Sequence, residues 1–77
     1  MKQQDFFEIL ASMLETDPEL VKAEVRLQDL PGWDSMAVIS FMALADSELG
    51  AVVSGKDMAK CETVGDLVKL FPGKLVD

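Results

Sequence analysis

Three runs of apolar residues at helical spacing constrain the fold of this chain more than any other feature of its sequence. Each run repeats at intervals of three and four residues, the period at which side chains share one face of an α-helix. The runs are Phe6, Ile9, Leu10 and Met13; Val38, Phe41, Met42, Ala45 and Leu49; and Val64, Leu67, Val68 and Phe71. Three such faces within 77 residues predict a single all-α domain, residues 1–77, folded as an antiparallel bundle of three main helices.

The first helix is expected over residues 3–15, and a long loop follows it. Pro18 ends the helix, because the residue before a proline avoids the helical region. From there to Asp34 the apolar periodicity is poor, although Leu27 and Leu30 are placed to hold the loop against the core. A loop of this length in a small domain is usually functional.

Capping residues mark where the remaining helices begin and end. Asp34 is a good N-cap for a second helix over residues 34–49, and Gly50 fits its C-terminal stop. A serine or threonine followed three residues later by an acid forms a capping box. Two capping boxes predict one short extra helix and then the last main helix, and they are Ser54 with Asp57 and Thr63 with Asp66.

The composition excludes several classes of function. No histidine occurs, which removes Ser-His-Asp and Cys-His catalysis and imidazole metal sites. Fourteen acidic residues against seven basic ones give a net charge of −7, so the surface repels nucleic acid and attracts proteins with basic patches. The chain has no apolar run that could cross a membrane, no signal peptide and one cysteine. We therefore expect a non-enzymatic, cytoplasmic monomer with no metal and no membrane insertion.

The segment Gly32-Trp33-Asp34-Ser35-Met36 is the candidate functional site. Ser35 is expected in the first turn of the second helix, where backbone N–H groups lack partners and the helix dipole is positive. A phosphate esterified to its hydroxyl would be stabilised there. On spacing alone, Asp34-Ser35 is more simply an ordinary helix cap, and this alternative stays open.

The sequence Asp34-Ser35-Met36 resembles the Asp-Ser-Leu signature of acyl carrier proteins, in which the serine accepts 4'-phosphopantetheine. Four further stretches resemble the family in the same order along the chain, so that the resemblance spans about residues 5–71. These stretches are Leu27-Gln28-Asp29-Leu30, Asp46-Ser47-Glu48-Leu49-Gly50, Lys56-Asp57-Met58-Ala59-Lys60 and Thr63-Val64-Gly65-Asp66-Leu67. The resemblance is to the bacterial type of carrier, and the start methionine and short tail favour a stand-alone protein over a domain of a synthase.

The resemblance implies a mode of action. A phosphopantetheinyl transferase would move the arm from coenzyme A to Ser35, and the arm thiol would then hold an acyl group as a thioester. Further partners would be an acyl-loading ligase or transferase and downstream acyl-using enzymes. Family members meet such partners through apolar residues beside the serine and acids on the second helix. The matching positions are Met36, Ile39, Ala43, Asp46 and Glu48.

The sequence also departs from the family's pattern. Two and five residues after the serine, fatty-acid carriers often have acids, and this chain has Ala37 and Ser40. The departure predicts a specialised acyl-transfer or biosynthetic pathway, fatty-acid-like or polyketide-like, with a less basic and more apolar partner. Two alternatives remain open: an aminoacyl carrier of the D-alanyl type, which has a similar Asp-Ser-Met, and an unmodified helical protein-interaction module.

The family often holds the acyl chain between its second and third helices. The matching candidate walls are Phe41, Met42, Ala45, Met58 and Cys61, and simple core packing is the alternative reading of the same residues. An aromatic ring at position 41 argues against a deep pocket, because the ring fills space that the chain would need.

Overall fold

The computed structural model describes residues 1–76 and confirms an all-α fold. No strand occurs within these residues, and their only β pairing consists of isolated bridges between Lys2 and Val76 and between Arg26 and Thr63. Four α-helices and two short 3₁₀ turns follow one another along the chain. They are α1 (Gln3–Leu14), η1 (Pro18–Leu20), η2 (Leu27–Asp29), α2 (Ser35–Leu49), α3 (Gly55–Ala59) and α4 (Val64–Val68).

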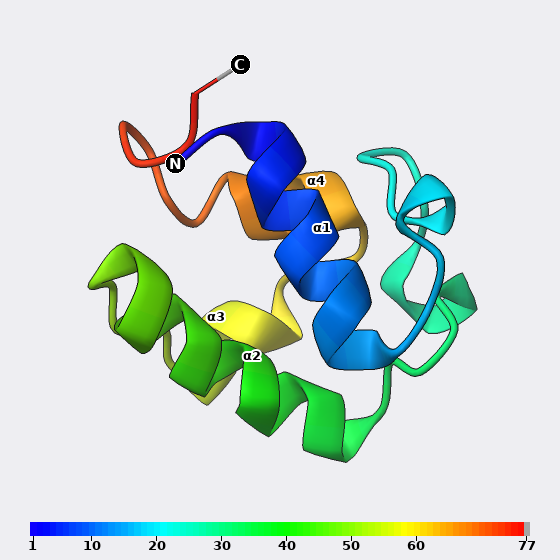
Figure 1. Cartoon of the computed structure of the whole chain (residues 1–77). Helices are drawn as coiled ribbons and strands as arrows, with labels where there is room; N and C mark the ends of the chain where they lie inside the picture. The colour runs from blue at the N-terminus through cyan, green and yellow to red at the C-terminus, as the bar shows by residue number, and fades with distance from the viewer. Residues whose placement is uncertain (77) are drawn as a thin grey trace.

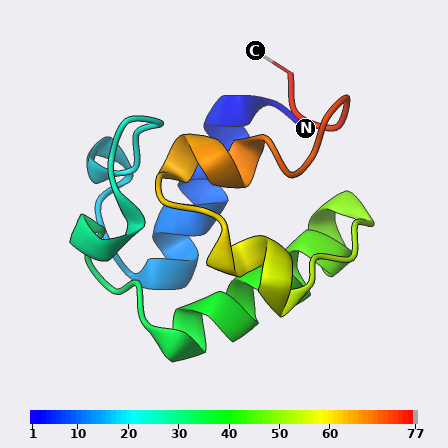
Figure 2. The same ribbon diagram turned by 180° about the vertical axis from the view of Figure 1, so that it is seen from behind.

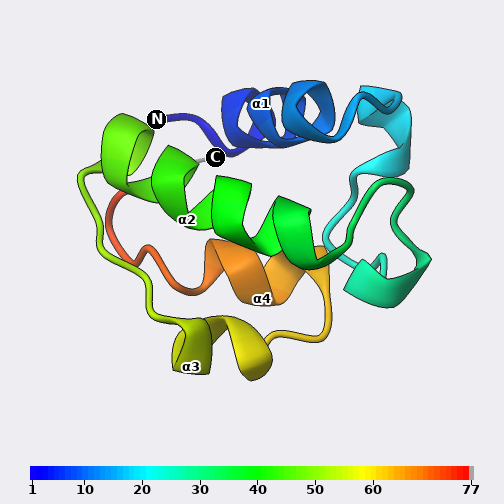
Figure 3. The ribbon, with the colours of Figure 1, turned by 90° about the horizontal axis from the view of Figure 1, so that it is seen from below.

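The helices form a bundle around one core. Helix α2 runs back beside α1 in the opposite direction, so the end of α1 lies near the beginning of α2 (Figures 1 and 3). Seen from behind, α4 crosses α1 in the view, and the short helix α3 follows α2 on the other side of the molecule from the loop that joins α1 to α2 (Figure 2). The two ends of the chain meet, since the Gln3 N–H donates to the Val76 carbonyl and the Val76 N–H donates to the Met1 carbonyl.

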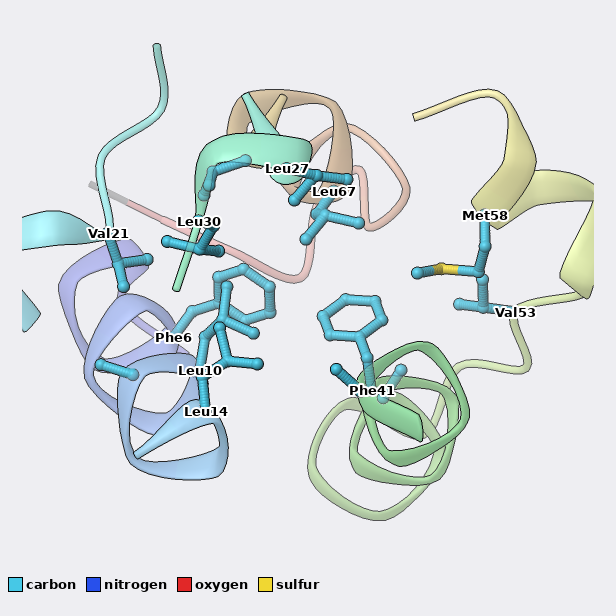
Figure 4. Packing of buried hydrophobic residues seen from close by; sticks show 14 of the residues in the cluster. Phe6, Leu10, Leu14, Val21, Leu27, Leu30, Phe41, Val53, Met58 and Leu67 are labelled. Carbon is cyan, nitrogen blue, oxygen red and sulfur yellow. The ribbon is translucent and has the colours of Figure 1, made fainter. Parts of the chain in front are cut away.

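Three phenylalanines form the centre of the core. Phe6 from α1, Phe41 from α2 and Phe71 from the segment after α4 are buried, with ring centroids 6.0 Å apart in all three pairs. Two of the pairs are edge-to-face, the arrangement that aromatic quadrupoles favour. Figure 4 shows Phe6 and Phe41 pointing toward one another. The helices are therefore fixed to one another by large side chains that lie close in space and far apart in sequence.

The buried faces of the long helices differ in part from the expected stripes. Both helices bury a row at intervals of four residues, the row that interlocks in the commonest mode of helix packing. On α2, Ala37 joins the core, while Val38 and Met42, expected inside, lie at its edge. On α1, Ile9 is half-buried and does not pack against the core, so its expected core position was wrong. The buried rows are Phe6, Leu10 and Leu14 on α1, and Ala37, Phe41, Ala45 and Leu49 on α2.

The last helix is shorter than its apolar stripe suggested. Helix α4 contains only five residues, as does α3, so two long and two short helices replace the expected three and one. Beyond Val68 the N–H groups of Leu70 and Phe71 donate to carbonyls three residues back, which is the tighter turn in which helices commonly end. Phe71 still reaches the core from this turn.

The predicted caps are all present. Both capping boxes form, Ser54 with Asp57 and Thr63 with Asp66. The backbone N–H groups of Glu62 and Thr63 both donate to the Asp66 carboxylate, and they lower its pKa because they stabilise the ionised form. Gly50 ends α2 in the left-handed conformation with φ of 61°.

The long loop after α1 is tied to the other half of the chain. Leu27 and Leu30 are buried, as expected. The Leu27 N–H donates to the Glu62 carbonyl at 2.9 Å, and the Gly65 N–H donates to the Ala23 carbonyl at 2.9 Å. Backbone hydrogen bonds and buried leucine side chains thus fix the loop to the rest of the fold. They also fix the position at which the loop enters α2.

Glu15 ends α1 in an unusual backbone conformation. Its φ of 55° and ψ of 42° are left-handed, and among residues 1–76 it is the only residue other than glycine with a positive φ. Its N–H donates to the Ser12 carbonyl at 3.1 Å, so the turn closes the helix as a glycine cap would. For a residue with a Cβ atom this conformation costs about 1–2 kcal/mol.

The Glu15→Gly variant is expected to be more stable than the wild type by about 0.5–1 kcal/mol. Glycine relieves the left-handed strain, and its greater freedom in the unfolded chain offsets part of the gain. Urea unfolding followed by circular dichroism measures the change. Glu15→Ala is the control, because alanine keeps the strain and removes the carboxylate. Equal stability of the glycine and alanine variants would contradict the assignment of strain to this residue.

Candidate functional site

Ser35 is the first residue of α2 and its side chain is exposed. Asp34 precedes it in extended conformation and caps the helix: its Oδ1 accepts from the Ala37 N–H at 2.9 Å, and its carbonyl accepts from the Val38 N–H at 3.1 Å. Within residues 1–76, the backbone N–H groups of Ser35 and Met36 have no hydrogen-bond partner. The Ser35 hydroxyl therefore lies beside two free donors at the positive end of a fifteen-residue helix.

The turn that delivers Ser35 depends on a glycine. Gly32 has φ of +85°, and a Cβ atom on it would lie 2.7 Å from the Leu14 carbonyl oxygen. The loop therefore passes directly against the end of α1, closer than any other residue type allows. This contact places Ser35 at the junction of α1 and α2.

Trp33 packs against the core instead of projecting into solvent. Its ring is half-buried and meets the ring of Phe41 edge-on, with centroids 6.1 Å apart. Trp33 is thus a packing residue that covers the turn.

A hollow of about 300 Å³ lies on one side of the Ser35 turn, between the long loop, α2 and α3. Of the expected acyl-pocket walls, Met58 and Cys61 line it, and Phe41, Met42 and Ala45 do not. Phe41 and Ala45 have no exposed surface at all, because they form the core beneath. The loop residues that contribute to this lining were not predicted from the sequence. The lining residues are Arg26, Leu27, Gln28, Trp33, Val38, Met58, Cys61 and Glu62.

Cys61 is a wall of this hollow and not a nucleophile. Its thiol is half-buried and donates to the Asp57 carbonyl at 3.5 Å. Burial raises the pKa of the Cys61 thiol, and the nearby carboxylates of Asp66 and Asp57 raise it further. The thiol is therefore neutral at neutral pH, whereas nucleophilic cysteines need the thiolate.

The outer face of α2 carries the expected apolar residues. Met36 is 68% exposed and Ile39 is 62% exposed, although both are large and hydrophobic. Ala43 and Asp46 are exposed and continue the same side of the helix. Glu48 is also exposed but lies about 120° around the helix from Met36, at about 100° per residue. Glu48 therefore does not share the face that Met36 and Ile39 define.

One of the two departures from the family's pattern has a different meaning in the structure. Ala37 is only 7% exposed and packs in the core cluster, whereas Ser40 is exposed. An acid at position 37 would be partly buried here. The missing surface charge is thus that of position 40 alone.

Comparisons with known proteins identify the family of the chain. A family model described as the phosphopantetheine attachment site matches residues 4–71. An acyl carrier protein MbtL of Mycobacterium sp. is 35% identical over 68 residues, which cover 88% of this chain and 76% of the relative. The chain belongs to the acyl carrier protein family. An acyl carrier protein of Thermotoga maritima is 34% identical over 67 residues, which cover 87% of this chain and 83% of the relative. A third relative, acyl carrier protein MbtL of Mycolicibacterium paratuberculosis, is 37% identical over 59 residues, 77% of this chain and 66% of the relative.

An acyl carrier protein is a carrier and not an enzyme, and its cofactor is 4'-phosphopantetheine. The start of α2 fits this group. A phosphodiester needs an exposed hydroxyl and hydrogen-bond donors for its charge, and Ser35 offers the hydroxyl beside the free N–H groups of Ser35 and Met36. The Asp34 carboxylate is already engaged by the Ala37 N–H.

The described part of the chain holds neither a cluster of metal ligands nor a membrane-spanning helix. Among residues 1–76, no three metal-binding side chains cluster. No helix there has the length and apolar character needed to cross a bilayer.

Proposed function

We propose that Ser35 carries the 4'-phosphopantetheine arm, and that the chain acts as a single acyl carrier domain over residues 1–77. The observation that supports this assignment most is the position of the Ser35 hydroxyl, exposed at the first residue of α2 beside unpartnered N–H groups. Ser40 and Ser47 are exposed on the same helix, but they lie beyond its first turn. Ser54 is engaged as a cap, since its Oγ accepts from the Asp57 N–H.

Each residue of the turn has a defined role in this proposal. In the transferase reaction the Ser35 Oγ forms a bond to the phosphorus that bears pantetheine. The pyrophosphate P–O bond of coenzyme A breaks, the adenosine bisphosphate half leaves, and the hydroxyl proton passes to a base of the transferase. Asp34 holds the first turn of α2 in place, and Gly32 allows the close approach to α1. When bound, the arm supplies a thiol that holds the acyl group as a thioester.

The hollow beside Trp33 is proposed to shelter the cargo. Its volume of about 300 Å³ is at the lower end of the range for small-molecule sites, about 300–1,000 Å³. This size favours a short acyl group or the first part of a longer one. The carrier is proposed to act as a cytoplasmic monomer, where coenzyme A and the transferase are both available.

A donor that already bears an acyl group tests the carrier function. The purified protein is incubated with a broad-specificity phosphopantetheinyl transferase and acetyl-coenzyme A, and its intact mass is measured. The expected gain is one acetyl-phosphopantetheine, and neutral hydroxylamine then removes only the acetyl group because thioesters are cleaved. The absence of any gain on folded protein, with a competent carrier modified in the same tube, would refute the proposal and favour the interaction module.

The exposed face of α2 supports a specialised pathway. Met36, Ile39 and Ala43 give an uncharged surface beside Ser35, with Asp46 as the first acid along that face. A partner that docks on it needs apolar groups more than basic ones. We propose that the partners are enzymes of such a pathway and not those of general fatty-acid synthesis.

The enzymes of general fatty-acid synthesis are expected to use the loaded protein roughly fivefold less efficiently than their own carrier. One missing surface ion pair is worth up to about 1 kcal/mol, which corresponds to that factor. Kinetic assays of malonyl transfer and condensation measure the ratio. Ser40→Glu is expected to recover most of the difference, because position 40 is exposed. Ala37→Glu, at a buried position, is expected to destabilise the fold instead. Equal efficiency of the wild-type protein and the enzymes' own carrier would contradict the specialised role.

A further inference from the structure

A second hollow lies on the other side of the Ser35 turn, where the end of α1 meets the beginning of α2. Its volume is about 280 Å³, and its lining includes Met13 from α1, the cap residue Glu15, Gly32 from the turn and Met36 from α2. Figures 1 and 3 show these two helix ends side by side. Ser35 is therefore flanked by hollows on both sides, and this second one is separate from the hollow lined by Trp33.

The second hollow is lined by two methionines and by two carboxylates, those of Glu15 and Asp34. The Asp34 carboxylate accepts from the Ala37 N–H, whereas that of Glu15 accepts no hydrogen bond within residues 1–76. Met13 is half-buried and Met36 is 68% exposed, so the two thioether side chains offer a deformable apolar surface. Glu15 is exposed at the rim, and the only ion pair within residues 1–76 joins Lys69 to Asp66. The carboxylate of Glu15 thus has no cation of the described chain to pair with.

The segment that supplies Met13 and Glu15 to the hollow carries charge of one sign. Residues 3–21 contain five acids and no base. A partner surface that fits the hollow must bring both an apolar side chain and a positive charge, because a neutral or acidic surface would leave the carboxylate without compensation.

Glu15 places its carboxylate at the rim of the hollow although its backbone conformation is unfavourable for a residue with a Cβ atom. Its left-handed conformation is one that glycine adopts without strain. Strained residues of this kind concentrate at binding and active sites, where the side chain has a use that offsets the strain. The strain agrees with a binding role for Glu15, and the free carboxylate and the apolar walls define what would be bound.

The position of the hollow next to Ser35 indicates which of the expected partner enzymes would cover it. An enzyme that makes a bond to the Ser35 hydroxyl must cover the residues next to that hydroxyl. Enzymes that act on the thioester work at the far end of the arm and can leave those residues uncovered. We propose that the hollow bounded by Met13, Glu15 and Met36 is a docking site for the phosphopantetheinyl transferase, which seats an apolar side chain in it and a lysine or arginine against Glu15. This inference rests on the proposed function of Ser35.

The Glu15→Gln variant tests the inference. With a purified broad-specificity transferase and coenzyme A at low salt, its kcat/KM for modification is expected to fall about fivefold, mainly through a higher KM. The deficit should shrink when the ionic strength is raised, because salt screens the lost charge pair. The backbone strain is unchanged in this variant, so its stability should match the wild type.

Glu8→Gln is the matched control, with the same change of charge on the same helix about 10 Å away, at about 1.5 Å per residue. Its kcat/KM is expected to stay within twofold of the wild type. Equal effects of the two variants would overturn the site and leave only the general field of an acidic protein. A Glu15→Gln variant as fast as the wild type would overturn it as well. A wild-type protein that is never modified would overturn the proposed function, and the docking site with it.

Discussion

The Ser35→Ala variant is expected to accept no phosphopantetheine while it folds as the wild type does. The substitution removes the only atom that the transferase reaction joins to phosphorus, so the loss should be complete. Ser35 is exposed and its side chain makes no hydrogen bond within residues 1–76, so the free energy of unfolding should change by less than about 0.5 kcal/mol. Intact-mass spectrometry and urea unfolding measure the two quantities.

Ser47→Ala is the control for the Ser35 substitution. Ser47 is also an exposed serine of α2, but it lies near the other end of the helix. Its alanine variant is expected to gain the full mass of one phosphopantetheine. Residual modification of the Ser35→Ala protein would mean that another hydroxyl carries the arm.

The Phe41→Ala variant is expected to lose about 3–5 kcal/mol of stability, the usual cost of removing a buried aromatic ring. Phe41 has no exposed surface, and its ring meets those of Phe6 and Phe71 at 6.0 Å and that of Trp33 at 6.1 Å. Its loss therefore opens a cavity between α1, α2 and the segment after α4. For a domain of 77 residues, whose total stability is about 4–12 kcal/mol, this is a large fraction.

Phe7→Ala is the control for the Phe41 substitution. Phe7 is half-buried and packs on Phe6 from the edge of the core, with ring centroids 6.1 Å apart. Its removal is expected to cost about 1–2 kcal/mol, because water replaces part of the ring. Chemical unfolding followed by circular dichroism compares the two variants. Equal losses would mean that Phe41 is not the centre of the core.

Features set by neighbouring residues in the sequence were predictable. The Asp34 N-cap, the Gly50 stop and the two capping boxes each depend on local hydrogen bonds that the residue types specify. The apolar periods likewise placed the long helices within one or two residues of their observed bounds. Leu27 and Leu30 were correctly expected to hold the loop.

Features set by contacts between distant segments were not predictable. The rows that α1 and α2 bury depend on how their ridges interlock, so Ile9 was placed in the core in error and Val38 lies at the edge of the core instead of within it. The approach of Gly32 to Leu14 and the left-handed Glu15 arise from the meeting of two helix ends, which no local pattern records. The hollows beside Ser35 have the same origin, since the loop and α1 supply walls that a reading of α2 and α3 alone omitted.

The choice of Ser35 as the candidate site came from the resemblance and not from spacing. An Asp-Ser pair at a helix start is also an ordinary cap, and Asp34 does cap α2. The structure adds that the Ser35 hydroxyl is exposed beside free N–H groups. Because the Ser35 hydroxyl does not hydrogen-bond to the N-terminal N–H groups of α2, it remains available for reaction with another molecule.

The most direct test locates the arm on the chain. After modification with coenzyme A and the transferase, trypsin cleavage at Arg26 and Lys56 releases a peptide of residues 27–56. This peptide contains four serines, Ser35, Ser40, Ser47 and Ser54. Fragmentation by tandem mass spectrometry is predicted to place the added phosphopantetheine between Asp34 and Met36. A fragment series that places it on any of the other three serines would contradict the assignment of Ser35.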